Sequence, residues 1–521
     1  MNQILLSPEI VVDLCCPYSP FRSETAKAVQ IAQTTCRVWV YTGAVGFMIR
    51  EATQALEGDA EKAAAALAEV TGKFQWLAAL AGDGAVFDQP DPEIGQLSRA
   101  CQRLGSEARL MTRNDSLLSE FQQAITPAQF IRLPATAASF EFIDLMSQQD
   151  YLRPELERRI HTVLHHGRYI MGPEIEELEQ ELAQYVDVPH CISVSSGTDA
   201  LLIAMMALGI GVGDEVITVP YTWISTAETI ALLGARTVFV DIDPHTFTMD
   251  VSLIEEAITP RTKAIMPVSL YGQCADMQTI NELALRHNLT VIEDAAQSFG
   301  ATFQGRRSCG LSTIGCTSFF PSKPLGCYGD GGALFTTEDE LAERMRQIRV
   351  HGQKQKHIHP IVGVNGRFDA LQAAVLLAKF PHFENECVRR QQAANTYAHL
   401  LQDQLGDRLE DLIRLPQIAD GNTSVYAQYT VLLKDRERVQ TALSQAGVPS
   451  VAYYVAPLHL QGAFASLGHQ PGDFLIAEEI AQKGLSLPMS PTITRDQQEL
   501  VVHVMAQCLK AGDISTAVPV E

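Results

Sequence analysis

The stretch CISVSSGTDALLIAMMALGIGVGDEVITVP, Cys191 to Pro220, decides the fold class of this chain. The apolar run CISVSS is followed by a glycine turn, by the helical pattern DALLIAMMAL and by a second apolar run, DEVITVP. The alternation continues with a helix in TAETIALLG and with strands in TVFVDI, KAIMPVS, LTVIED, CTSFF and ALFTT. Strands separated by helices form a mostly parallel sheet with helices on both faces, so the sequence predicts an α/β fold. Ligands of such sheets bind at the carboxyl ends of the strands.

The length of 521 residues is too great for one compact domain. We predict a small α/β domain over 1–135, a linker at 136–140, a large domain over 141–383 and a small α+β domain over 384–521. Strands are expected in EIVVDL, RVWVY and EARLMTRND of the first domain. In the last domain a long helix from about Glu384 precedes strands in SVYAQYTVLL and SVAYYV, with the helix RERVQTALSQAG between them.

The charge balance is acidic, with 39 Lys and Arg against 61 Asp and Glu and a formal net charge of -22. This argues against nucleic-acid backbone binding as the main function. No basic start with a long apolar run is present, so we expect a cytoplasmic protein without a membrane span. The 11 cysteines include no CxxC, which favours buried reduced thiols over disulfides or zinc.

Polar residues follow two of the predicted strands in a way that suits a flat, phosphorylated ligand. After CISVSS, Gly197 allows a tight turn, and Thr198 and Asp199 open a helix whose free N–H groups attract phosphate. An ordinary helix cap is the alternative interpretation. After DEVITVP, Trp223 could lie flat on a ring or could simply pack in the core.

Two further strand ends supply an acid and a lysine. Asp294 directly follows the apolar strand LTVIE, with Gln297 one helical turn later. Lys323 follows CTSFF within SFFPSKPLGCYGDGGAL, Ser318 to Leu334, where prolines and glycines restrict the chain. A phosphate site, a flat aromatic, an acid and a lysine together indicate pyridoxal 5′-phosphate. The lysine forms a Schiff base with its aldehyde, and the acid keeps the pyridine nitrogen protonated.

The motifs SSGTDAL, PYTWISTAE, VIEDAAQSFGA and SFFPSKPLGCYGDGGA resemble those of the DegT/DnrJ/StrS sugar-nucleotide aminotransferases, which are fold type I pyridoxal-phosphate enzymes. The resemblance runs from about Ala138 to the C-terminus. Within the family, PVSLYGQCADM, VGVNGRFDALQAA and SVYAQYTV resemble most closely the UDP-2-acetamido-2-deoxy-3-oxo-glucuronate 3-aminotransferases of surface-polysaccharide synthesis, including lipopolysaccharide O-antigen.

The resemblance implies a role for each residue of the site. Lys323 would carry the cofactor and move a proton, Asp294 would pair with the pyridine nitrogen, and Gln297 would lie near the ring hydroxyl. Trp223 would stack on the ring. The phosphate would be held at the turn that Gly197 opens, by the following residues: Thr198, the backbone of Asp199, and Ser318. L-Glutamate would donate the amino group to a UDP-linked 3-oxo sugar acid.

The resemblance also implies a homodimer with shared sites, in which Asn365 would reach the neighbouring subunit's phosphate. Arg367 would suit the sugar carboxylate, although a surface ion pair is the alternative. Tyr453 and Tyr454 stand where relatives commonly have a His-Tyr pair, a departure that bears on sugar recognition. Some relatives are dehydratases, but Lys323 in place of a histidine argues against that activity.

The cluster HGQKQKHIHP could suggest a metal site through His351, His357 and His359. No carboxylate or cysteine is interleaved to complete a ligand set, so a solvated or pyrophosphate-contacting loop is favoured and no metal is predicted.

The first ~135 residues resemble a PIN-like domain, in which converging carboxylates hold metal ions for phosphodiester cleavage. The candidates are Asp13, Glu51, Glu93 and Asp115. A degenerate domain that serves assembly, RNA contact or control is the alternative. A regulatory nucleic-acid-binding protein that keeps a pyridoxal-phosphate domain as a sensor is therefore a second hypothesis for the whole chain.

Overall fold

The computed structural model describes residues 141–512 and the backbone of short strands within the first 140 residues. The chain divides into two units, Met1–Ala138 and Ser139–Glu521. In the first unit, parallel strands are ordered β3-β2-β1-β4-β5. These strands are β1 (Asn2–Leu6), β2 (Cys36–Val40), β3 (Gln75–Trp76), β4 (Ala108–Met111) and β5 (Ala124–Ile125).

Strands β2 and β4 confirm the predictions made from RVWVY and EARLMTRND. The predicted strand EIVVDL lies outside the described residues. The same holds for the four predicted acidic residues, Asp13, Glu51, Glu93 and Asp115.

The second unit is built on a seven-stranded sheet with the order β6-β14-β13-β10-β9-β7-β8. All of the strands except β14 run in one direction, so the expectation of a mostly parallel sheet is confirmed. The bounds are β6 (His190–Val194), β7 (Glu215–Thr218), β8 (Arg236–Phe239), β9 (Thr262–Ile265), β10 (Thr290–Asp294), β13 (Ile314–Ser318) and β14 (Gly332–Thr336). Each lies within or beside an apolar run that predicted it.

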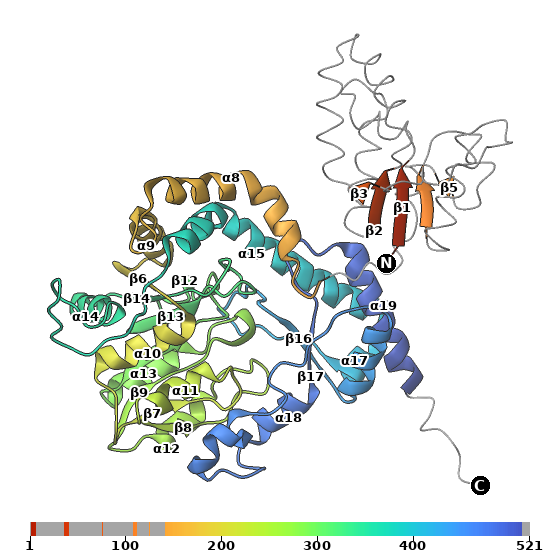
Figure 1. Ribbon diagram of the computed structural model, residues 1–521. Helices are drawn as coiled ribbons and strands as arrows, with labels where there is room; N and C mark the ends of the chain where they lie inside the picture. The colour runs from red at the N-terminus through yellow and green to blue at the C-terminus, as the bar shows by residue number, and fades with distance from the viewer. Residues whose placement is uncertain are drawn as a thin grey trace, which may run out of the picture. The chain divides into compact units, whose positions relative to one another are not determined.

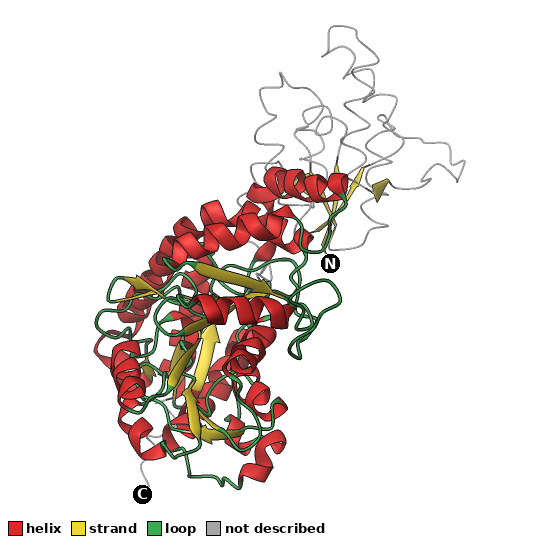
Figure 2. Cartoon of the chain, turned by 90° about the vertical axis from the view of Figure 1, so that its left-hand side faces the viewer, coloured by secondary structure: helices red, strands yellow, loops and turns green. Residues whose placement is uncertain are grey.

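Helices cover both faces of this sheet (Figure 2). One core contains α10 (Gly197–Leu208) and α14 (Asp339–Arg349) with alternate strand residues such as Val216. The other contains α9 (Pro173–Val186), α13 (Met277–Arg286) and the first half of α15 (Ala370–Leu405), with the intervening strand residues such as Ile217. Burial on both faces explains why the strands read as continuous apolar runs rather than as alternating ones.

Helix α15 links the sheet to the small C-terminal domain, and α8 (Leu145–His166) lies along it (Figure 1). The long helix that we expected from about Glu384 begins at Ala370, so the predicted domain boundary at 383/384 falls inside α15. Pro381 lies within the helix without ending it. The small domain packs the second half of α15 against α17 (Arg436–Gln445), α19 (Arg495–Gly512) and the antiparallel sheet β15-β16-β17.

The small sheet comprises β15 (Ile413–Arg414), β16 (Tyr429–Leu433) and β17 (Gly484–Leu487), with α18 (Leu475–Lys483) preceding the last strand. Strand β16 confirms the prediction from SVYAQYTVLL, whereas the strand predicted in SVAYYV is wrong. Val451 makes only an isolated bridge to Ser486, and Tyr454 has a φ of 57°, a left-handed conformation that a strand cannot contain. This segment therefore turns, and it carries two tyrosines into a cavity described below.

Within residues 141–512, no helix combines the length and the apolar composition that crossing a bilayer requires.

Candidate active site

A cavity of about 420 Å³ opens at the carboxyl ends of the parallel strands. This is the edge at which an α/β sheet binds its ligands, and the volume is that of a small-molecule site. The structure brings most of the predicted site residues into its lining: Gly197, Thr198, Trp223, Asp294, Gln297, Ser318, Lys323, Tyr453 and Tyr454. Residues that lie more than 250 positions apart in the sequence, such as Gly197 and Tyr454, thus share one surface.

The phosphate side of the cavity is the first turn of α10. Ser196 is the helix cap, because its hydroxyl accepts from the backbone N–H of Asp199 at 3.0 Å. The carboxylate of Asp199 accepts from the hydroxyls of Ser195 at 2.5 Å and Ser196 at 3.1 Å, and Asp199 is not among the lining residues. Gly197 and Thr198 do line the cavity, so it is their part of the turn that faces the ligand.

Gly197 is required where it lies. A Cβ atom at this position would lie 2.7 Å from Cβ of Ser318, closer than real contacts allow. Thr198 Oγ1 and Ser225 Oγ are 2.8 Å apart, which adds two hydroxyls beside the same turn. Backbone N–H groups at a helix start, together with the hydroxyls of Thr198, Ser225 and Ser318, form a donor set suited to a phosphate, so this end of the cavity fits the cofactor's phosphate.

Asp294 ends β10 and is 5% exposed. Its carboxylate accepts from Thr226 Oγ1 at 2.7 Å and from the backbone N–H of Ala296 at 3.2 Å. Burial raises the pKa of this carboxyl, whereas Thr226, Ala296 and the nearby amine of Lys323 lower it. A buried carboxylate held in this way can accept a hydrogen bond from the protonated nitrogen of a ring in the cavity.

Lys323 lies in the loop that follows β13, and its backbone N–H donates to the Phe320 carbonyl at 2.8 Å. Burial lowers the pKa of its amine to about 8, although the charge of Asp294 acts in the opposite direction. An amine with this pKa is neutral in about a tenth of the molecules at neutral pH, far more than an ordinary lysine, so it can react with an aldehyde. The residues present therefore fit pyridoxal phosphate at both of its ends.

Trp223 is 60% exposed and lines the cavity, so the core-packing interpretation is wrong. Gln297 has a fixed amide orientation, since its Oε1 accepts from the Tyr271 N–H at 2.9 Å and its Nε2 donates to the Tyr454 hydroxyl at 2.7 Å. Burial raises the pKa of Tyr454, and its phenol is therefore neutral. Tyr454, which stands at the tyrosine position of the pair noted in the sequence, thus supplies an uncharged hydroxyl to this wall, whereas the departure is Tyr453, which also lines the cavity.

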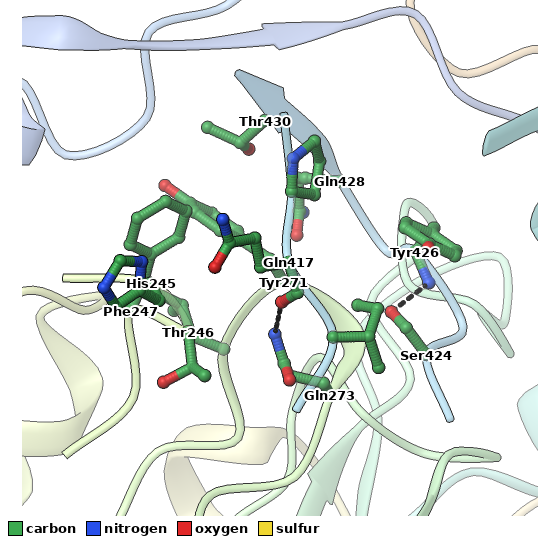
Figure 3. A pocket seen from close by; sticks show the side chains of 13 residues that line it. His245, Thr246, Phe247, Tyr271, Gln273, Gln417, Ser424, Tyr426, Gln428 and Thr430 are labelled. Atoms are coloured by element: carbon green, nitrogen blue, oxygen red, sulfur yellow. Dashed lines mark hydrogen bonds between the residues drawn. The ribbon is translucent and has the colours of Figure 1, made fainter. Parts of the chain in front are cut away.

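Gln428 forms part of two cavities. It lines the main cavity, and it also lines a cavity of about 20 Å³ between the large and small domains (Figure 3). There Gln273 Nε2 donates to the Gln417 carbonyl at 2.8 Å and the Tyr426 N–H donates to Ser424 Oγ at 3.0 Å. This volume suits a water molecule and not a substrate. The smaller cavity therefore belongs to the interface between the two domains and is not a second active site.

Asn365 and Arg367 do not line the main cavity of their own chain. Asn365 is exposed, and its backbone pairs with Val350 in an isolated bridge. Arg367 has a buried Nε without a hydrogen-bond partner, and no ion pair is formed by it among residues 141–510. Within this range, the surface ion pair considered as the alternative for Arg367 is thus not present.

His351, His357 and His359 are exposed, and His359 Nδ1 lies 2.9 Å from the His351 carbonyl. In the part of the chain that the structure describes, no group of His, Cys, Asp or Glu side chains is arranged to hold a metal ion.

Several residues of the site were missed from the sequence. Ser225 and Thr226 follow Trp223 at the same strand end, so their place in the sequence already indicates a position near the ligand. Tyr271 and Gln428 gave no such signal. Tyr271 has a φ of 56° in a short turn, and Gln428 directly precedes a strand of the other domain.

Comparison with known proteins agrees with this geometry. Residues 150–506 match the DegT/DnrJ/EryC1/StrS aminotransferase family. The UDP-2-acetamido-2-deoxy-3-oxo-D-glucuronate aminotransferase of Pseudomonas aeruginosa is 54% identical over 351 residues, which cover 67% of this chain and 95% of that enzyme.

Two solved structures are similar to this fold. DesV of Streptomyces venezuelae matches with a TM-score of 0.68 and 39% identity, over 71% of this chain and 98% of that one. NtdA of Bacillus subtilis, solved with bound pyridoxamine phosphate, matches with a TM-score of 0.65 and 31% identity, over 71% of this chain and 83% of that one. The chain therefore belongs to the DegT/DnrJ/EryC1/StrS aminotransferase family, as a pyridoxal phosphate-dependent sugar-nucleotide aminotransferase of fold type I.

Proposed function

We propose that this enzyme transfers the amino group of L-glutamate to C3 of a UDP-linked 2-acetamido-3-oxo-glucuronic acid, for surface-polysaccharide synthesis. The observation that carries the proposal is the arrangement of Lys323 and Asp294 on one cavity wall, beside the opening turn of α10. The identity of 54% to the Pseudomonas aeruginosa enzyme supports the choice of sugar.

Pyridoxal phosphate, when bound, supplies an aldehyde carbon that takes up the amino group. It also supplies a ring that accepts electrons from the reacting carbon. Gly197, Thr198 and Ser318 would hold its phosphate, and Trp223 would cover the ring. Asp294 would hold the ring nitrogen in its protonated form, because a buried carboxylate is costly without a cationic partner. Gln297 would contact the ring's hydroxyl side.

Lys323 Nζ is the group that moves protons. In the first half of the reaction it would take the proton from the α-carbon of glutamate, and in the second half it would return a proton to C3 of the sugar. Its lowered pKa suits both directions, since an amine that titrates near the working pH can accept and donate with little penalty. Two half-reactions on one site give ping-pong kinetics.

Arg367 is our candidate for binding the sugar carboxylate, in sites that two copies of the chain share. Its buried Nε lacks a partner, and a guanidinium matches a carboxylate in geometry and charge. Neither Arg367 nor Asn365 lines the cavity of its own chain, which is consistent with both reaching the cavity of a second copy.

The proposal is tested by the absorbance of the purified holoenzyme. L-Glutamate should abolish the yellow cofactor band, and the UDP-linked 3-oxo sugar acid should restore it, with a 3-amino sugar identified by mass spectrometry. The matched comparison is the same UDP 3-oxo sugar without its carboxylate, which should restore the band much more slowly. A band that glutamate leaves unchanged would contradict the proposal, and would direct attention to a nucleic-acid role for the N-terminal unit.

A further inference from the structure

The loop that carries Lys323 is closed by its own backbone. The N–H of Phe319 donates to the Gly331 carbonyl and the N–H of Cys327 donates to the Phe319 carbonyl, each at 2.8 Å. A Cβ atom at Gly326 would lie 2.4 Å from the Pro321 carbonyl oxygen, so the loop folds tightly onto the residues that precede Lys323. Any shift of Gly326 is therefore passed on to the base of the lysine side chain.

Two side chains of α15 hold this loop from outside. Gln372 accepts from the Tyr328 N–H at 2.8 Å and donates to the Tyr328 carbonyl at 3.3 Å. Lys379 Nζ donates to the Gly326 carbonyl at 2.5 Å. The two residues are seven positions apart, about two helical turns, so they lie on one face of the helix. Together they fix the loop at two points against a rigid element.

Lys379 is an unusual residue for its position, because it is 2% exposed. Burying an ammonium group is costly unless a specific interaction compensates. Its charge lies 5.2 Å from the centre of the Tyr328 ring, which gives a favourable cation–π contact to the same loop. Burial lowers the pKa of Lys379 to about 8, with Glu386 acting in the opposite direction.

A simpler interpretation is that Lys379 only neutralises the buried carboxylate of Glu386. The contacts of Glu386 argue against it. Its two oxygens accept from Gln148 Nε2 at 2.9 and 2.7 Å, and one also accepts from the Tyr151 hydroxyl. Among residues 141–510, Lys379 forms no ion pair within 4.0 Å. The contacts of the Lys379 ammonium are thus directed to the loop, at Gly326 and Tyr328.

We propose that Lys379 is a positioning residue for the reaction, which sets the location of the Lys323 amine by holding the Gly326 carbonyl. The inference rests on the role of Lys323 given under the proposed function. It concerns a residue that lies outside the cavity and touches neither cofactor nor substrate.

The test uses the holoenzyme of Lys379→Met, which removes the donor and keeps an unbranched apolar side chain. Cofactor retention, the pH titration of the cofactor absorbance, kcat and KM are measured. We expect the variant to retain the cofactor, with the absorbance titration displaced from that of the wild type. The kcat should fall roughly 100-fold, the loss typical of a catalytic group misplaced by about 1 Å, while the KM for the sugar stays unchanged.

The control for general destabilisation is Leu401→Ala, which creates a cavity in the small-domain core, where α15 packs. It should lower the melting temperature and leave the absorbance titration in place. A wild-type kcat and absorbance titration in Lys379→Met would overturn the inference. The inference would also be overturned if Leu401→Ala showed the same loss of kcat and the same displaced titration as Lys379→Met. If Lys379→Met does not fold, Gln372→Leu removes the other loop contact without removing a charge and should displace the titration in the same way.

Lys323→Ala separates this inference from the proposed function. If Lys323→Ala is inactive and Lys379→Met behaves as wild type, only the positioning role is wrong. If Lys323→Ala retains full activity, the proposed function fails first.

Discussion

The hydroxyl of Thr226 donates a 2.7 Å hydrogen bond to Oδ2 of Asp294, a residue 68 positions further along the chain. This contact joins the start of α11 (Ser225–Leu232) to the end of β10, beside the main cavity that Asp294 lines. It stabilises the ionised form of a carboxylate that burial would otherwise tend to neutralise.

Thr226→Val should therefore raise the pKa of Asp294 further. As the pH falls, Asp294 would then be protonated at a higher pH than in the wild type. The acidic limb of the kcat/KM profile is therefore shifted to higher pH. A hydrogen bond to a charged group contributes about 1.5–3 kcal/mol, which corresponds to a roughly 10-fold or greater loss of kcat/KM below neutral pH. Thr229→Val is the matched control, because its hydroxyl donates to the Ser225 carbonyl within the helix. Identical acidic limbs in the two variants would contradict the assignment.

Gly197→Ala tests the phosphate end of the site. The added methyl would lie 2.7 Å from Cβ of Ser318, so either the first turn of α10 or the end of β13 must move. Overpacking of this kind costs about 1–3 kcal/mol, and we expect cofactor affinity to fall roughly 10-fold. Titration of the apoenzyme with pyridoxal phosphate measures it.

Gly211→Ala is the control for that substitution, since the nearest atom to its added methyl is the Leu233 carbonyl oxygen at 3.8 Å. It should bind the cofactor as the wild type does. Equal affinities in all three proteins would mean that the turn at Gly197 does not contact the phosphate.

The large domain could be predicted from the sequence because its strands are buried on both faces and read as uninterrupted apolar runs. The residues at their carboxyl ends, among them Thr198, Asp294 and Lys323, then fall on one edge of the sheet for topological reasons. The order of strands in the sheet was not predicted. It depends on which helix packs against which face, and such long-range packing leaves no local pattern.

The small domain was predicted less well, for a physical reason that SVAYYV illustrates. Valine and tyrosine favour strands, but Tyr454 adopts a left-handed conformation, and its hydroxyl accepts a hydrogen bond from Gln297 Nε2 in the wall of the cavity. Tertiary contacts overrode the local propensity. The same limit applies to Gln428 and Tyr271, whose positions depend on the packing of one domain against the other.

Lys323 should show its lowered pKa in the rate at which the apoenzyme captures pyridoxal phosphate. The neutral amine is the reactive form, so the rate should rise with pH and level off above about 8. An ordinary lysine would level off near 10.4. Stopped-flow absorbance measures the rate, and borohydride reduction followed by peptide mapping identifies the modified residue. Lys323→Ala should lose turnover and yield no modified peptide; a plateau only near 10.4 would show that the amine is not desolvated.

Arg367 provides the test of both sugar recognition and shared sites. Arg367→Leu should lower kcat/KM for the UDP-linked 3-oxo sugar acid roughly 10- to 100-fold, the value of losing a charge-assisted pair. The neutral sugar analogue should be affected little, and Arg344→Leu, at an exposed position on α14, should change neither substrate. Equal losses for the acid and the neutral sugar would mean that Arg367 supports the fold and not the carboxylate.

Mixed dimers decide whether Arg367 acts on its own cavity or on that of a second copy. If sites are shared, a dimer of one Lys323→Ala chain and one Arg367→Leu chain carries both defects in one site and neither in the other. Co-expressed, differently tagged chains should then be more active toward the sugar acid than either variant is alone. If Arg367 served its own chain, every site would keep one defect and no activity would return. Because Arg367 does not line the cavity of its own chain, recovery is the expected result.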